Sequence, residues 1–148
     1  MARRVFFSFH FERDAWRAGQ VRNSWVTQDR EFAGFWDSVE WEKVKKKGDE
    51  AIKDWINKQL KGTSVTVVLI GTETSERPYV NYEIKKSIEI GNGLLGIYIH
   101  KIKDQFGKTS SRGEDPLPKI YSTYDWVSDD GYKNFGDWVE KAAKAAGR

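Results

Sequence analysis

The chain of 148 residues contains no cysteine, only two histidines and only three prolines. Without cysteine the protein has no disulfide framework, no thiolate-bound metal or iron–sulfur cluster and no thiol nucleophile. Two histidines are too few for a histidine-rich metal site, and the carboxylates do not follow the spacing of metal ligands. The sequence therefore predicts a protein without a metal site that folds on its hydrophobic core alone.

Long hydrophobic runs are also missing. The longest largely apolar run, Val65–Ile70, is far shorter than the roughly 20 residues of a membrane-spanning helix. Only four residues precede the apolar segment that begins at Val5, which is too few for a signal peptide and favours an immediate first strand. The length fits one domain over residues 1–148, and we expect a cytoplasmic protein without membrane contact.

An excess of charge of one sign is absent as well. The chain has 25 lysine and arginine residues against 22 aspartate and glutamate residues, and both halves are nearly balanced. The densest basic run, residues 45–47, lies beside Glu42 and Asp49. A mixed-charge segment of this kind is typical of a solvated helix or loop, so the sequence argues against a nucleic-acid partner.

Aromatic residues, in contrast, are abundant. They make up 14% of the chain, and seven of them are tryptophans. Several lie in polar surroundings, namely Trp16, Trp25, Trp36 and Trp41. Two interpretations stay open for them, the hydrophobic core and a stacking surface for a planar ligand such as a nucleobase.

Hydrophobic periodicity predicts alternating strands and helices. Expected strands are residues 4–9, 32–36, 65–70, 94–100 and a segment within 120–127, and expected helices are residues 12–25, 50–60, 78–90 and 130–146. The stripe of helix 78–90 is expected at Val80, Ile84 and Ile88, and that of helix 130–146 includes Tyr132 and Ala146. The alternation predicts an α/β fold with a mainly parallel five-stranded sheet covered on both faces.

The segment of residues 101–119 is long and polar for a connection inside a small domain. It follows a predicted strand, so it should emerge at the carboxyl edge of the sheet, where ligands bind. Segments of this length are usually functional or poorly ordered, and the sequence favours a lid and a disordered loop equally.

Well-known site motifs fail on their structural context. Residues 91–96 match the dinucleotide pattern GxGxxG, but they close a helix and enter a strand, whereas the motif must follow a strand and open a helix. The acidic residues of a phosphoacceptor receiver and the phosphate loop of a flavodoxin are both missing after the first predicted strand. The sequence therefore supports neither a phosphoacceptor receiver nor a flavodoxin.

Two segments should face each other at the carboxyl edge of the sheet. Residues 8–14 follow the first predicted strand and residues 77–84 follow the third, and these strands are neighbours in the flavodoxin-like order. Glu83 borders the buried stripe of its helix, and a fixed carboxylate beside aromatic rings can hold ribose hydroxyls and stabilise an oxocarbenium ion. The alternative is a surface ion pair with Arg77, Lys85 or Lys86, which periodicity alone favours.

Several motifs together resemble the TIR domains. Residues 5–9 followed by Asp14 resemble the first TIR box, and residues 63–71 followed by Val80-Asn81-Tyr82-Glu83-Ile84 resemble the third strand and the helix of the catalytic glutamate. The match is closer to the TIR-like family that includes the Thoeris antiphage sensor. That similarity rests on Ser8-Phe9-His10, on residues 13–17 and on the Gly-x-x-Pro-Leu loop of residues 113–117.

This resemblance implies a flavodoxin-like, TIR-like α/β/α fold and an enzyme that cleaves the nicotinamide–ribose bond of NAD⁺. NAD⁺ would be the substrate, with no further cofactor, and the ADP-ribose would be cyclised into a signal for a separate effector. The resemblance also implies self-association and a phage-derived trigger. The alternative is a non-catalytic TIR-like module that binds nucleotides or self-associates.

The same resemblance assigns roles to individual residues. Glu83 corresponds to the catalytic glutamate, and the substrate-binding positions are Ser8, Phe9, His10, Trp36, Asp37, Ser38, Tyr79, Asn81 and Tyr82. Residues 36–38 match the loop that helps to close the site and mediates self-association. Tyr79 replaces the tryptophan usual in TIR enzymes and keeps an aromatic face. The glycine-rich closing loop of many TIR domains is not evident.

Overall fold

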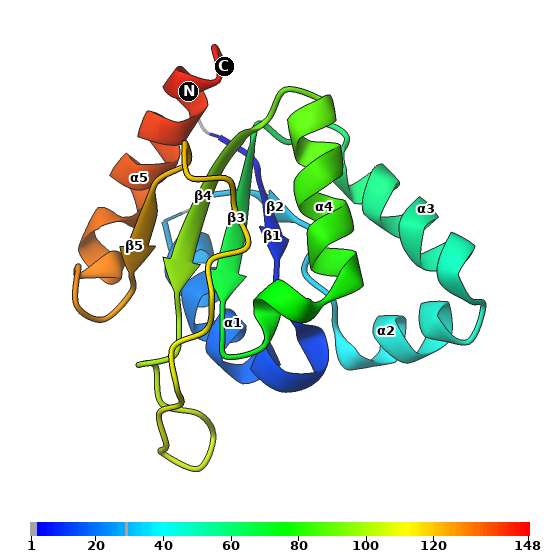
Figure 1. Ribbon diagram of the computed structural model, residues 1–148, viewed down its shortest axis with the longest axis horizontal. Helices are drawn as coiled ribbons and strands as arrows, with labels where there is room; N and C mark the ends of the chain where they lie inside the picture. The colour runs from blue at the N-terminus through cyan, green and yellow to red at the C-terminus, as the bar shows by residue number, and fades with distance from the viewer. Residues whose placement is uncertain (1–2, 29) are drawn as a thin grey trace.

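A parallel sheet forms the centre of the protein, whose computed structural model describes residues 3–28 and 30–148 (Figure 1). Its five strands have the order β2-β1-β3-β4-β5, and every neighbouring pair is parallel. This is the flavodoxin-like order. The strands are β1 (Val5–Ser8), β2 (Phe32–Ala33), β3 (Val65–Ile70), β4 (Gly93–Tyr98) and β5 (Thr123–Asp125). The predicted fold class is thereby confirmed.

Helices cover both faces of this sheet, which gives three layers (Figure 1). One face is covered by α1 (Phe11–Val26) and α5 (Gly131–Ala145). The other is covered by α4 (Pro78–Glu89) and, beyond it, by α2 (Ser38–Lys45) and α3 (Asp49–Leu60). A short 3-10 turn, η1 (Thr74–Glu76), leads from β3 into α4. No helix in the described ranges is long and apolar enough to cross a membrane.

The core is divided by the alternation of side chains along the strands. Phe7, Val67 and Leu69 point toward α1 and α5, whereas Phe6 and Val68 point toward α2, α3 and α4. All six residues of β3 are buried, as a strand covered on both faces requires. Burial on both faces of the sheet therefore explains the continuous, largely apolar run of residues 65–70.

The predicted strand of residues 32–36 is wrong beyond Ala33. Gly34 has a φ of +75°, and a Cβ at this position would collide with the ring of Phe6. The chain therefore leaves the sheet after two residues and carries Trp36 away from the strand. The predicted strand of residues 94–100 similarly ends at Tyr98.

Helix α2 was not predicted from periodicity, because Trp41 is its only buried residue. A capping signal marks its start. Asp37 is the N-cap, and its carboxylate accepts a hydrogen bond of 2.7 Å from the backbone N–H of Glu40. An N-cap aspartate three residues before a glutamate is the pattern of a capping box, and this pattern could have located the helix.

The predicted inner faces of two helices are partly wrong. In α4 the buried residues are Val80, Glu83, Ile84 and Ser87, so two polar residues occupy the stripe and Ile88 is exposed. In α5 the residues Tyr132 and Ala146 are exposed. Tyr132 points away from the buried stripe of the helix, and Ala146 lies beyond the last helical residue.

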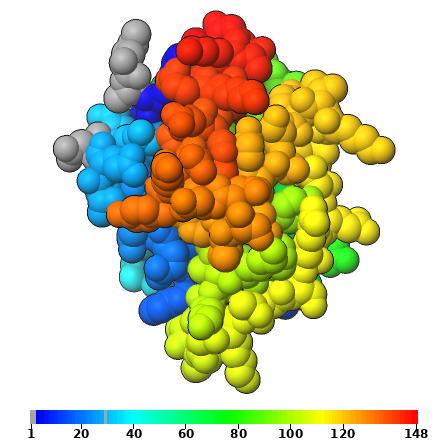
Figure 2. All heavy atoms as spheres, turned by 90° about the vertical axis from the view of Figure 1, so that its left-hand side faces the viewer, coloured from blue at the N-terminus to red at the C-terminus, as the bar shows by residue number. Residues whose placement is uncertain are grey.

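Residues 99–122 connect β4 to β5 without a helix. Because β4 and β5 are parallel, the chain has to run back from the carboxyl end of β4 to the amino end of β5. This return explains the length of the segment. Leu117 and Tyr121 pack on the α4 side of β4, and the N–H of Ser110 donates to the carbonyl of His100 at 2.9 Å. In the space-filling view this crossover segment (residues 99–122) covers the surface beside α5 (Figure 2). Neither the lid nor the disordered loop is needed to explain it.

Candidate functional site

A cavity of about 290 Å³ opens at the carboxyl end of β1. Its lining residues come from the segment after β1, from the first two turns of α4 and from the α2–α3 pair. Five residues predicted for the site line this cavity: Phe9, His10, Trp36, Tyr79 and Glu83. The two segments that were expected to face each other therefore do so.

Glu83 is buried at the base of the cavity with 4% of its surface exposed. Its Oε1 accepts a hydrogen bond of 2.6 Å from Ser8 Oγ, and Ser8 is itself fully buried. Burial raises the pKa of Glu83 to about 8, and the hydrogen bond from Ser8 opposes this shift. The surface ion pair is thus the wrong interpretation of Glu83, and Lys86 pairs with Glu89 instead.

Local sequence explains how these two polar groups meet. Ser8 ends β1 on the face that α4 covers, and Glu83 lies on the buried stripe of α4. Pro78 begins the helix at N1, where a missing N–H costs nothing. Ser8 donates a hydrogen bond to Glu83, but Ser8 itself does not line the cavity.

Aromatic rings form much of the cavity wall. Trp36 is 5% exposed and stacks on Trp55 with ring centroids 3.4 Å apart and an interplanar angle of 17°. Trp41 meets Trp36 edge to face at 4.9 Å. Of the four tryptophans that stood out in the sequence, Trp25 belongs to the core and Trp16 is exposed outside the cavity. Trp36 and Trp41 belong to a hydrophobic cluster and also line the cavity, and a role in stacking on a planar ligand stays a prediction.

Polar groups surround the mouth of the cavity. Tyr79 donates its hydroxyl to Asp49 Oδ1 at 2.7 Å, and burial raises the pKa of Tyr79 to about 12. The same hydrogen bond lowers the pKa of Asp49. Burial is the main cause that lowers the pKa of His10, with a further contribution from the charge of Arg77. His10 is therefore neutral at pH 7 and can donate or accept a hydrogen bond.

Besides Ser8, four further residues that the resemblance assigned to substrate binding do not line this cavity. Asp37 caps α2, and Ser38 is exposed at the first position of that helix. Asn81 donates from Nδ2 to the carbonyl of Ser75, and Tyr82 donates its hydroxyl to Asn57 Oδ1 at 2.9 Å. Their sequence proximity to Trp36 and Glu83 does not bring them into the cavity, because their side chains point to other elements.

Sequence reasoning missed several lining residues. Phe11 and Trp41 extend the aromatic wall, and Ile52 adds an apolar side chain from α3. Lys45 and Arg77 contribute the positive charges. Lys45 belongs to the helix that periodicity did not reveal, and Arg77 lies at the end of a loop, where no periodic pattern applies.

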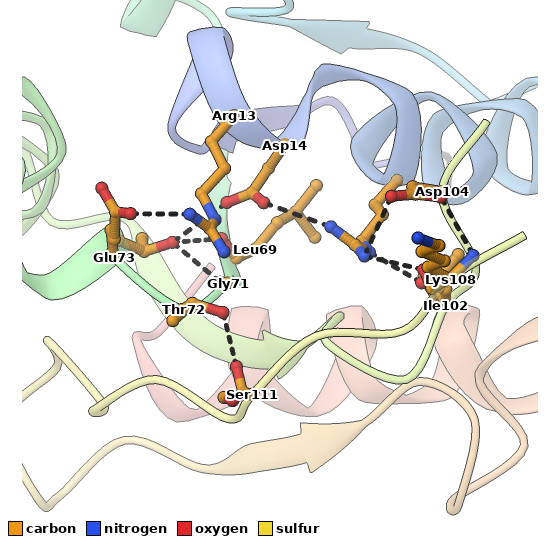
Figure 3. A network of polar contacts seen from close by, with 12 residues as sticks. Arg13, Asp14, Leu69, Gly71, Thr72, Glu73, Ile102, Asp104, Lys108 and Ser111 are labelled. Carbon is orange, nitrogen blue, oxygen red and sulfur yellow. Dashed lines mark hydrogen bonds and ion pairs between the residues drawn. The ribbon is translucent and has the colours of Figure 1, made fainter. Parts of the chain in front are cut away.

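A second buried carboxylate, Asp14, lies at the same sheet edge in a polar network (Figure 3). It is 1% exposed, and burial raises its pKa to about 6. Thr74 Oγ1 lies 3.5 Å from its Oδ2, and Arg17 Nη1 lies 3.9 Å from its Oδ1. The N–H of Gly71 donates to Thr74 Oγ1 at 2.7 Å. Asp14 thus links α1 to the turn that precedes α4.

Arg17 extends this network to the crossover segment (Figure 3). Its Nε donates to the carbonyl of Ile102 at 2.7 Å, and its Nη2 donates to that of Lys108 at 3.0 Å. Thr72 Oγ1 donates to the carbonyl of Ser111 at 2.6 Å. The network therefore holds the crossover segment against the strand ends, and it contributes no residue to the cavity.

Within residues 3–28 and 30–148, no cluster of three or more histidine, aspartate or glutamate side chains could hold a metal ion. The cavity combines the buried carboxylate of Glu83 with aromatic faces, and its other charged lining residues are the cations Lys45 and Arg77 and the acids Glu12 and Asp49. Aromatic faces suit a planar ring, the buried carboxylate suits ribose hydroxyls, and a lining cation suits an anionic group.

Comparisons with known proteins agree with this geometry. Residues 6–104 match the family model described as "Thoeris protein ThsB, TIR-like domain". A Bacillus cereus (strain MSX-D12) protein named "Putative cyclic ADP-D-ribose synthase ThsB1" is 37% identical over 191 aligned positions, which cover 94% of this chain and 100% of that protein. The matched range includes the residues of the cavity.

Proposed function

This chain belongs to the family of Thoeris ThsB proteins with a TIR-like domain, and on that basis we propose that it cleaves NAD⁺ and cyclises the ADP-ribose. The observation that carries the proposal is Glu83, a buried carboxylate held by Ser8 at the base of an aromatic cavity. The name of the Bacillus cereus relative supports the same chemistry.

The reaction begins with the bond between the ribose C1′ and the nicotinamide nitrogen. Both electrons of this bond leave with nicotinamide, and C1′ becomes an oxocarbenium ion. Glu83 accepts hydrogen bonds from the ribose hydroxyls and stabilises the positive charge, while the aromatic wall limits access of water. A nitrogen or hydroxyl oxygen of the same ADP-ribose then bonds to C1′, and one proton is released to solvent. Attack by water would instead give linear ADP-ribose and a proton.

The raised pKa of Glu83 gives the reaction a pH dependence. With a pKa of about 8 the side chain is mostly protonated at pH 7 in the free protein. The positively charged nicotinamide ring of NAD⁺ favours the ionised carboxylate, so substrate binding lowers the pKa. We expect kcat/KM to rise with pH until Glu83 is ionised at about pH 9, and kcat to level off at a lower pH.

The test of this proposal replaces Glu83 by glutamine, which keeps the shape and removes the charge. We expect nicotinamide release from NAD⁺ to fall by a factor of about 100 or more, measured by liquid chromatography with mass spectrometry. Glu89→Gln is the matched control, because it changes an exposed glutamate of the same helix. Wild-type rates in the Glu83→Gln variant would refute the assignment.

The product identifies the second half of the reaction. A cyclic product is lighter than linear ADP-ribose by one water, and we propose that it carries the signal to a separate effector in antiphage defence in the cytoplasm. A phage-derived trigger and self-association belong to the same proposal, so the assay is run with and without lysate from infected cells.

One observation favours a competing function, a module that binds nucleotides without catalysis. Glu83 is mostly neutral at pH 7 in the free protein, and a neutral group does not stabilise an oxocarbenium ion. This alternative predicts that NAD⁺ binds without release of nicotinamide at about pH 7, whereas release that appears only at about pH 9, where Glu83 is ionised, would favour the catalytic function.

A further inference from the structure

Arg77 is the cation of the cavity that has no ion-pair partner among the residues that the structure describes. It is the N-cap of α4 and lines the same cavity as Glu83 and His10. The other lining cation, Lys45, has its Nζ 3.6 Å from Glu12 Oε2. Within residues 3–28 and 30–148, no carboxylate lies at ion-pair distance from Arg77.

The buried nitrogens of Arg77 and His10 point to a missing acceptor. Nε of Arg77 and Nδ1 of His10 are both buried, and neither has a hydrogen-bond partner in the described part of the chain. Both side chains line the same cavity, and the charge of Arg77 contributes to the lowered pKa of His10 after the larger effect of burial. Buried polar atoms are rarely left without partners, so an unpaired pair beside a cavity indicates a bound group.

The chemistry of the two side chains selects that group. A guanidinium presents N–H groups in a planar fork that matches the oxygens of a phosphate. The neutral imidazole of His10 can donate one hydrogen bond without adding charge. At the base of the cavity, Glu83 already provides the acceptor for ribose hydroxyls. A phosphate linked to that ribose would lie on the side of Arg77.

We propose that Arg77, assisted by His10, binds the diphosphate of the dinucleotide and so makes the site specific for nucleotides with a diphosphate. This proposal rests on the proposed function, because the ribose at Glu83 is part of it. Arg77 then acts in substrate binding, and the bond that breaks lies at the other end of the same ribose.

The experiment measures the binding of ADP-ribose by titration calorimetry, which needs no turnover. We expect Arg77→Gln to weaken ADP-ribose binding by about 10-fold to 100-fold, as for the loss of hydrogen bonds to a charged group. Arg77→Lys retains the charge without the fork and should recover part of the affinity. Thermal unfolding of both variants establishes that they fold like the wild type.

A control variant makes the test specific. Arg22→Gln removes an arginine of α1 that does not line the cavity, and it should change the affinity for ADP-ribose by no more than about twofold. Equal affinity of Arg77→Gln and wild type overturns the proposal, and so does an equal loss of affinity in Arg22→Gln.

The proposed function can fail independently of this result. If Arg77→Gln binds ADP-ribose as the wild type does while the wild type releases nicotinamide from NAD⁺, only the role of Arg77 is refuted. If the wild type does not bind ADP-ribose and does not release nicotinamide, both proposals are overturned.

Discussion

Glu83 occupies a position at which the helical pattern calls for an apolar side chain. Polar residues on this buried stripe are accommodated by hydrogen bonds, since Ser8 donates to Glu83 and Ser87 Oγ donates to the Glu83 carbonyl at 2.7 Å. Periodicity counts only apolar residues and therefore favoured a surface ion pair. The resemblance to TIR domains identified Glu83 because it compares residue types at fixed spacing and does not depend on hydropathy.

The burial of Glu83 also predicts a pH-dependent stability. Its pKa is about 8 in the folded protein, against an ordinary value of 4.5. Between these values the folded state binds a proton that the unfolded state has lost, so the contribution of Glu83 to the free energy of unfolding falls as the pH rises. Glu83→Gln should therefore raise Tm relative to wild type more at about pH 9 than at about pH 6.

This Tm difference is measured by differential scanning calorimetry in matched buffers. Glu89→Gln, on the exposed side of the same helix, should show no such dependence on pH. A difference for Glu83→Gln that stays constant from about pH 6 to about pH 9 would contradict the raised pKa.

At the scale of the elements, the sequence located those with a strong apolar pattern. β3, α3 and α4 begin or end within one or two residues of the predicted bounds, because their apolar residues are dense and their ends carry clear signals such as Pro78 and Gly62. α2 escaped prediction because it buries one residue only. The crossover segment has no periodic pattern, and its path depends on contacts distant in sequence.

Arg17 is the main link between α1 and the crossover segment, and its removal should loosen that segment. Arg17→Gln loses the hydrogen bonds to Ile102 and Lys108 and leaves Asp14 without its closest cation. We expect trypsin to cleave after Lys101, Lys103 or Lys108 about tenfold faster or more, because the free energy of local opening of the segment is lower in the variant.

Limited proteolysis followed by mass spectrometry identifies the cleaved bonds. The control is Arg22→Gln, which changes an exposed arginine of the same helix. If both variants are cleaved at the wild-type rate, the crossover segment is held by Leu117 and Tyr121 rather than by Arg17.

For the whole molecule, the order of strands decides which distant residues meet. The sequence predicted the parallel sheet and the meeting of residues 8–14 with residues 77–84, because alternating strands and helices restrict the connections to a few arrangements. The sequence did not predict the side-chain directions in the loops. Asp37 and Asn81 lie within two residues of cavity residues in sequence, and only the fold shows that they point elsewhere.

The shared sheet predicts that the protein unfolds in a single cooperative transition. β1 contributes Phe7 to one layer and Phe6 to the other, so neither layer can unfold without exposing the other. Far-ultraviolet circular dichroism and tryptophan fluorescence should give the same midpoint, with an unfolding enthalpy of about 100 kcal/mol for this chain length. An earlier fluorescence change would indicate that the α2–α3 side unfolds separately.

The stack of Trp36 on Trp55 has a consequence for observing the site. Two indole rings this close and nearly parallel couple electronically, and they absorb and emit as a pair rather than as independent chromophores. Since Trp36 is part of the cavity wall, a ligand that moves it changes this coupling. The protein therefore contains an intrinsic optical reporter of this cavity, which a test of ligand binding can use without a label.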